Sequence, residues 1–172
     1  SNTALAVLTV SGSNDSTVLD LDSDDSTGAT SGNVNVGFTE GAGAVVLNSG
    51  ISINDVDDTD LESATISLTN AQNGADEGLA FNETLASTFG IGFMYGANNH
   101  YISLSGTGTL DEYRQLLETV TYDNSNGNPN TTTRTVTFVV HDGDADSNTA
   151  TANVSVTAVN DPPGATDDTY NN

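Results

Sequence analysis

The sequence contains no cysteine and no lysine, and its basic residues, apart from two histidines, are Arg114 and Arg134. Without cysteine, neither a disulfide framework nor a cysteine-based zinc site can hold the fold together. Affinity for nucleic acids and for anionic membranes depends on lysine and arginine replacing counterions. The near absence of positive charge therefore excludes both classes of partner.

Long hydrophobic runs are also missing. No stretch of about 18 apolar residues occurs, and no basic segment is followed by an apolar run. We therefore expect no membrane insertion and no signal segment, and we interpret the chain as an internal piece of a longer protein.

Negative charge is abundant: 24 aspartates and glutamates give a formal net charge of -22. Repulsion at this density destabilises a compact state unless cations neutralise it. Bound metal is one remedy, and a saline environment is another. The positions of the acidic residues distinguish the two.

Sixteen of the acidic residues fall into four short windows, at residues 15–25, 55–62, 142–146 and 161–168. A solvated surface gives no reason for such bunching, whereas a hard cation needs several oxygens in one coordination shell. The pattern favours metal sites, and a saline habitat stays open beside them.

The chain repeats part of itself. Residues 1–15 and 147–161 align without a gap at an offset of 146, and eight of the 15 positions are identical. We therefore predict that residues 1–13 are the last strand of a preceding repeat and that 14–161 form one complete repeat domain. Residues 162–172 would then begin the next repeat or form a linker.

Apolar residues alternate with polar ones in seven segments separated by Gly, Asn, Asp and Ser clusters, as expected of strands. These segments are 34–38, 45–47, 51–53, 64–68, 101–104, 136–140 and 152–156. The pattern predicts an all-β fold, an antiparallel β-sandwich with one wet face per sheet. Thr109 and Glu112 have capping-box spacing, so we expect one short helix near 110–118. We interpret the tract from Tyr122 to Thr133 as a polar turn.

Four motifs occur in order along the chain. They are Phe-Thr-Glu at 38–40, Asn-Asp-Val-Asp-Asp at 54–58, His-Asp-Gly-Asp-Ala-Asp-Ser at 141–147 and Val-Asn-Asp-Pro-Pro at 159–163. With these motifs the chain resembles cadherin-like and Ig-like (Greek-key) tandem repeats of large bacterial surface adhesins, including those of the RTX type. The resemblance implies a cell-adhesion protein on the bacterial cell surface or outside the cell, with neighbouring repeats of the same chain as partners.

In such families an Asn-Asp linker, an early Glu and an Asp-x-Asp group meet at the junction between repeats and hold Ca²⁺, which stiffens the array. The resemblance assigns this role to Asn14, Asp15, Glu40, Asp55, Asp57, Asp58, Asp144, Asp146, Asn160 and Asp161.

Physical chemistry adds Asp142 to these candidates. Ca²⁺ takes six to eight oxygens, and the alternate carboxylates of Asp142, Asp144 and Asp146 can point to one side of an irregular loop. The run is not an EF-hand, because Ser147 stands where that loop needs Gly. We therefore expect the site to be assembled where a linker, an early loop and a late loop converge at one end of the sandwich.

Other functions have weaker signals. His100 and His141 lie in no catalytic motif, so we predict that the chain is not an enzyme. The segment 89–101 concentrates aromatic residues between glycines, and Tyr95, His100 and Tyr101 could hold an extracellular glycan or a surface protein. The alternative interpretation of this segment is a hairpin with a buried aromatic face.

Overall fold

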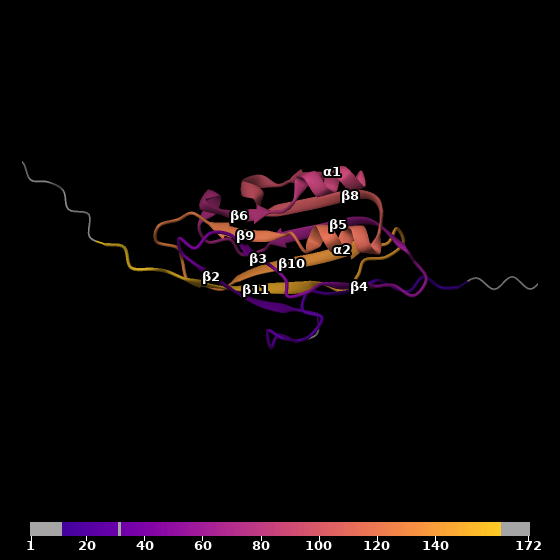
Figure 1. Ribbon diagram of the computed structural model, residues 1–172, viewed down its shortest axis with the longest axis horizontal. Helices are drawn as coiled ribbons and strands as arrows, with labels where there is room; N and C mark the ends of the chain where they lie inside the picture. The colour runs from indigo at the N-terminus through magenta and orange to yellow at the C-terminus, as the bar shows by residue number, and fades with distance from the viewer. Residues whose placement is uncertain (1–11, 31, 163–172) are drawn as a thin grey trace, which may run out of the picture.

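The computed structural model describes residues 12–30 and 32–162, and its largest element is a six-stranded sheet (Figure 1). In spatial order the strands are β2 (Val34–Thr39), β11 (Ala150–Thr157), β10 (Arg134–His141), β5 (Asp60–Leu68), β8 (Tyr101–Thr109) and β7 (Gly92–Tyr95). Neighbouring strands pair antiparallel, except that β2 and β11 run parallel.

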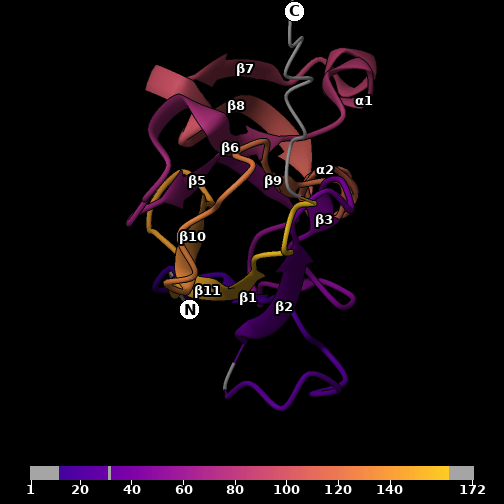
Figure 2. The ribbon, with the colours of Figure 1, turned by 90° about the vertical axis from the view of Figure 1, so that its left-hand side faces the viewer.

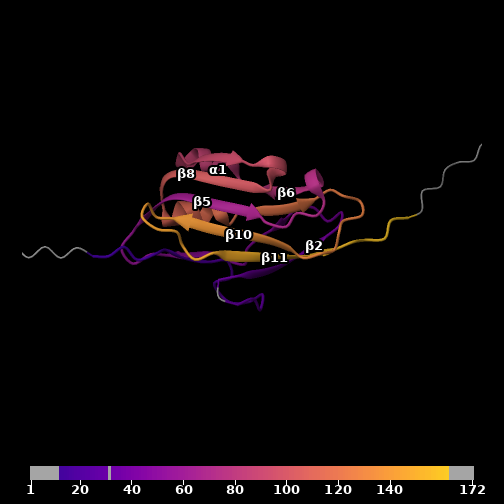
Figure 3. The ribbon, with the colours of Figure 1, turned by 180° about the vertical axis from the view of Figure 1, so that it is seen from behind.

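Smaller sheets form the facing layer. One has the order β3 (Val45–Val46), β9 (Thr121–Asn124) and β6 (Glu77–Ala80), and the other pairs β1 (Val18–Asp20) with β4 (Ser52–Asn54). The predicted all-β sandwich is confirmed. The chain that forms it runs back and forth along the long axis of the molecule (Figure 3).

Alternation in the strands places one row of side chains between the layers. In β10 every second residue from Arg134 to Val140 is buried, and in β11 the same holds from Ala150 to Val156. Phe38 of the large sheet meets Tyr122 of the facing layer edge to face, with ring centroids 5.3 Å apart. This geometry suits two aromatic quadrupoles and closes the core.

In the part of the chain that the structure describes, two α-helices interrupt the strands. Helix α2 (Leu110–Leu117) has the capping box that the sequence predicts, with Thr109 and Glu112 bonding each other's backbone. It buries Tyr113, Leu116 and Leu117. Helix α1 (Glu83–Phe89) was not predicted, although Asn82 caps its first turn and Gly90 ends it in the left-handed region. Short 3-10 turns, η1 (Gly74–Asp76) and η2 (Ala97–Asn99), flank β6 and β8.

The predicted polar turn from Tyr122 to Thr133 is wrong at its start. Tyr122 and Asn124 belong to β9, where both side chains are buried. Asn124 bonds the Tyr122 hydroxyl, which in turn donates to Glu77, so these polar groups are satisfied inside the protein. Their composition alone gave no sign of this network.

The described chain enters the sandwich at one end of its long axis and leaves it at the other (Figure 1). We call the end that holds residues 12–17 the N-terminal pole, and the end where β2 and β11 finish the C-terminal pole. The predicted flanking segments, 1–13 and 162–172, fall almost entirely on residues 1–11 and 163–172, which lie outside the described residues. In the described ranges, no helix has the length and apolar character needed to cross a membrane.

Candidate metal centre at the N-terminal pole

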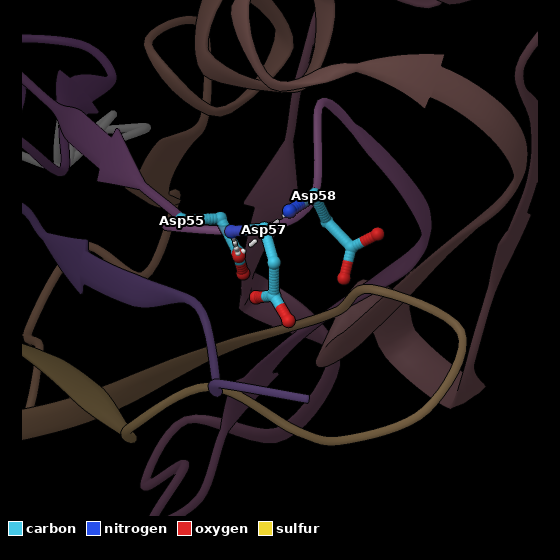
Figure 4. Close-up of side chains that lie close together, drawn as sticks. All are labelled: Asp55, Asp57 and Asp58. Carbon is cyan, nitrogen blue, oxygen red and sulfur yellow. Dashed lines mark hydrogen bonds between the residues drawn. The ribbon is translucent and has the colours of Figure 1, made fainter. Parts of the chain in front are cut away.

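The loop that follows β4 gathers three aspartates. Asp55 accepts hydrogen bonds from the backbone N–H groups of Asp57 at 3.1 Å and Asp58 at 3.0 Å, which bends the chain directly after the strand. The bend turns the three side chains to the same side of the loop (Figure 4). One carboxylate oxygen from each lies within 4.8 Å of the others, close enough to share one cation.

The loop that follows β10 is built by the same local chemistry. Asp142 Oδ1 accepts the backbone N–H of Asp144 at 2.8 Å and that of Ala145 at 2.7 Å. Gly143 between them has φ of 114°, a left-handed conformation in which a side chain would be strained. The turn holds Asp142 and Asp144 at the end of the sandwich without help from a ligand.

Residues 14–17 join these two loops. Asn14 Nδ2 donates to Asp142 Oδ2 at 3.3 Å, and the Asp15 N–H donates to the Asp57 carboxylate at 3.3 Å. Thr17 Oγ1 donates to Asp55 Oδ2 at 2.7 Å. A linker segment, an early loop and a late loop therefore meet at the N-terminal pole.

The electrostatics of the pole are unbalanced. Burial, followed by the charges of Asp57, Asp55, Asp142 and Asp144, raises the pKa of Asp58. Burial also acts to raise the pKa of Asp55, but hydrogen bonds from Thr17 and the Asp58 backbone outweigh it, so that this pKa is lowered.

For Asp142 the outcome is the same. Burial raises its pKa, but the N–H groups of Ala145 and Asp144 outweigh that effect and lower it. Fixed donors thus keep Asp55 and Asp142 ionised, and Asp58 faces their charges.

Neither arginine relieves this repulsion. Arg114 of α2 pairs with Asp111 on the same helix and with Glu118 directly after it, and Arg134 pairs with Glu77 in the core. The three clustered carboxylates supply oxygen ligands, which suit a hard cation such as Ca²⁺. Asp55, Asp57 and Asp58 would hold it, with Asp142, Asp144 and the 14–15 segment beside them.

The remaining predicted ligands lie outside this group. Asp146 closes the 142–146 loop through an isolated bridge with His141. Glu40 lies at the C-terminal pole, where its Oε2 accepts the Val159 N–H at 2.7 Å. Asn160 and Asp161 follow in the same segment. The structure therefore divides the predicted set between two poles, with Glu40 hydrogen-bonded to the linker that leaves the domain.

Tyr95, His100 and Tyr101 do not share one surface. Tyr95 lies among Phe81 and Phe93, with ring centroids 5.9 and 6.1 Å away. His100 Nε2 is within hydrogen-bond distance of two backbone carbonyls, those of Gly74 and Glu77. Tyr101 is 36% exposed and belongs to the row of β8 residues on the outer face of the sheet.

Sequence reasoning missed two residues at this pole. Thr17 is buried and orients Asp55, and Glu62 lies beside the 142–146 loop, with its Cγ 3.3 Å from the place of a Cβ on Gly143. Glu62 belongs to the acidic window 55–62, which was a usable signal. Thr17 gave none, because its role depends on the pairing of β1 with β4.

Comparison with known proteins gives a partial likeness. Over 89 residues, 51% of the chain, the sequence is 32% identical to Halomucin from Haloquadratum walsbyi (strain DSM 16790 / HBSQ001). The matched part corresponds to 1% of the length of Halomucin, so it resembles a short segment of a very long protein. No known protein family matches the chain, and the cadherin-like and RTX-type resemblance stays a prediction.

Proposed function

We propose that the chain is a calcium-binding structural module of a long surface or secreted protein. The observation that carries this proposal is the convergence of residues 14–17, 55–58 and 142–145 at one pole, where carboxylates crowd together without a basic partner. Ca²⁺ bound there would neutralise the repulsion and join the linker to two loops of the sandwich.

The arrangement of the poles supports a linear array. At the offset of 146, Asn160 and Asp161 correspond to Asn14 and Asp15, which contact the acidic loops of the N-terminal pole. The linker that leaves one repeat would therefore contact the acidic loops of the next. Val56 is 87% exposed at one pole and Val159 is 50% exposed at the other, so each end also offers an apolar contact to a neighbour.

The likeness to a segment of Halomucin, a protein named as a mucin, supports an extracellular or cell-surface setting and a role within a long chain. Neighbouring repeats are the partners that this proposal requires. Calcium-dependent binding of a glycan or a peptide by this module stays a prediction, as does the absence of catalysis.

Thermal unfolding in different salts tests the proposal. In calcium at about 100 times its dissociation constant, we expect stabilisation of about 2.7 kcal/mol, which for a chain of this size raises the melting temperature by roughly 5–10 °C. Magnesium at equal ionic strength should do less, because it demands tight octahedral geometry. Equal gains from calcium, magnesium and sodium chloride would show mere screening and contradict the proposal.

A matched pair of variants locates the effect. Asp58→Asn removes the carboxylate that faces the most like charge, so without calcium it should melt higher than the natural protein and should lose most of the gain from calcium. Glu83→Gln removes the same charge from the exposed first turn of α1 and should keep that gain. If both variants respond to calcium alike, the site is not at the N-terminal pole.

A further inference from the structure

Strand β7 forms one open margin of the six-stranded sheet. It pairs with β8 alone, and the Gly96 N–H donates to the Tyr101 carbonyl at 2.8 Å in continuation of that ladder. Hydrogen-bonded and non-hydrogen-bonded pairs alternate in an antiparallel ladder. Met94 therefore directs its backbone groups toward β8, and Phe93 and Tyr95 direct theirs away from it. Within the described chain these outward groups have no hydrogen-bond partner.

The strand itself carries none of the charged residues or prolines that commonly block a sheet edge. Residues 84–110 contain no Asp, Glu, Lys, Arg or Pro, in a chain whose net charge is -22. Natural sheet edges are commonly blocked by charges, prolines or covering segments. The side chains of β7 are apolar and accessible, since Met94 is 64% exposed and Phe93 is 37% exposed.

The opposite margin of the sheet, at β2, is covered. The Asn35 N–H donates to Thr27 Oγ1 at 3.1 Å, and Asn35 Nδ2 donates to the Thr27 carbonyl. The covering loop carries three aspartates, Asp22, Asp24 and Asp25. The view along the long axis shows β2 and β7 at opposite margins of the molecule (Figure 2).

We propose that β7 pairs antiparallel with β7 of a second copy of this chain, across a two-fold axis at Met94. The sequence Gly92-Phe93-Met94-Tyr95-Gly96 is nearly symmetric in chemistry about Met94. In this register Phe93 lies opposite Tyr95 of the second copy, and their outward N–H and C=O groups bond each other. Met94 lies beside its own equivalent on the outer face, and glycines meet at both ends.

Charge selects a second copy as the occupant. Two molecules of net charge -22 repel over most of their surfaces, and the uncharged segment 84–110 lets them approach with least repulsion. A two-fold contact is self-complementary, and the strand presents the same apolar stripe from either direction. Because the strand is short, we expect a weak dimer that salt strengthens by screening.

Cysteine substitution tests this register in a protein that has no cysteine of its own. Met94 would occupy a non-hydrogen-bonded pair, where Cα atoms lie about 4.5 Å apart, within the range that a disulfide spans. Under mild oxidation the Met94→Cys variant should form a disulfide-linked dimer at least about tenfold faster than Val18→Cys, because pairing raises the local thiol concentration. Val18 is the control because it is 56% exposed on β1.

A second measurement follows association without cross-linking. In sedimentation at high protein concentration and moderate salt, the natural protein should dimerise reversibly. Met94→Lys places two like charges together and should abolish the dimer, whereas Val18→Lys should keep it. Both effects should be the same in calcium and in chelator, which separates this proposal from the metal site.

Equal cross-linking rates at positions 94 and 18, with a natural protein that stays monomeric, would overturn the proposal. A segment of a different protein would then be the candidate to pair with β7. A dimer that persists in Met94→Lys would also overturn it, because association would then use another surface.

Discussion

The buried carboxylate of Asp22 receives all of its stabilising hydrogen bonds from neighbouring residues of the same loop. It is 1% exposed, and it accepts the Thr27 hydroxyl at 2.6 Å, the Thr27 N–H at 2.9 Å and both donors of Ser26 at 3.1 Å. The Thr27 hydroxyl is the largest influence on its pKa, and with the other donors it outweighs burial and lowers the pKa from 3.8 to about 2. The donors that stabilise the charge of Asp22 thus come from its own loop, whereas Asp58 faces the like charges of other aspartates.

The low pKa of Asp22 predicts a pH effect with a definite sign. A carboxyl group whose pKa is lower in the folded state adds stability above its unfolded pKa and loses it as pH falls through the folded value. The stability difference between the natural protein and Asp22→Asn should therefore be constant near neutral pH and shrink between pH 3.8 and about 2. Urea unfolding at stepped pH measures it.

The exposed Asp24 of the same loop supplies the control for that experiment. The free energy of unfolding of Asp24→Asn should differ less from that of the natural protein over the whole acid range. If the stability difference between the natural protein and Asp22→Asn does not change with pH, the low pKa of Asp22 is contradicted.

Two strands from opposite layers are joined by a buried ion pair. Arg134 of β10 is fully buried, and its Nε lies 2.7 Å from Glu77 Oε2 of β6. Tyr122 donates to the same carboxylate oxygen at 2.6 Å, and Asn73 accepts from Arg134 Nη2. Burial acts to raise the pKa of Glu77, but donors from Tyr122, Asn73 and Arg134 outweigh it and lower that pKa. The pair is therefore satisfied on all sides.

Breaking this ion pair should be costly, whereas replacing it should not. Arg134→Met leaves the Glu77 carboxylate buried without a counter-charge, which we expect to lower the free energy of unfolding by about 3–5 kcal/mol. The double variant Arg134→Met/Glu77→Leu removes both charges and should recover most of that loss. Denaturant titration of both variants measures the difference. Equal losses in the two would mean that packing, and not charge, determines the effect.

At the scale of elements, the sequence predicted whatever depends on neighbours in the chain. Helix α2 was predicted because Thr109 and Glu112 cap it locally, and β10 was predicted because one face of the strand is apolar. Strand β9 was missed because Tyr122 and Asn124 need partners on β6 and directly before η1 to be buried. The parallel pairing of β2 with β11 joins residues more than a hundred positions apart, and no local pattern specifies it.

The two ends of the whole molecule differ. The N-terminal pole is acidic, and the linker leaves from the C-terminal pole. If repeats follow one another at the period of 146 residues, Glu40 accompanies the outgoing linker to the acidic pole of the next domain. Each junction would then draw oxygens from two repeats. A single repeat presents half of each junction.

A protein in which residues 14–159 are followed directly by residues 14–161 keeps the period of 146 and provides a test at this scale. We expect small-angle scattering to show an elongated particle in calcium and a smaller, more variable maximum dimension in chelator, because the unneutralised junction can bend. Asp58→Asn in the second copy should reduce the response, whereas the same change in the first copy should leave it. A particle whose dimensions ignore calcium would contradict the array.

By itself, the sequence determined the all-β class, helix α2, the repeat offset and the residues that could bind a cation. The class, the helix and the candidate ligands follow from alternation, capping and bunching, which act over short separations in the chain. The offset follows from comparing two segments of the sequence with each other. The tertiary structure decided which acidic residues meet, since Asn14, Asp57 and Asp142 converge through strand pairing while Glu40 and Asp161 go to the other pole. It also decided that β7 is an open margin, because strand order in a sheet depends on long-range contacts and not on the residues of the strand.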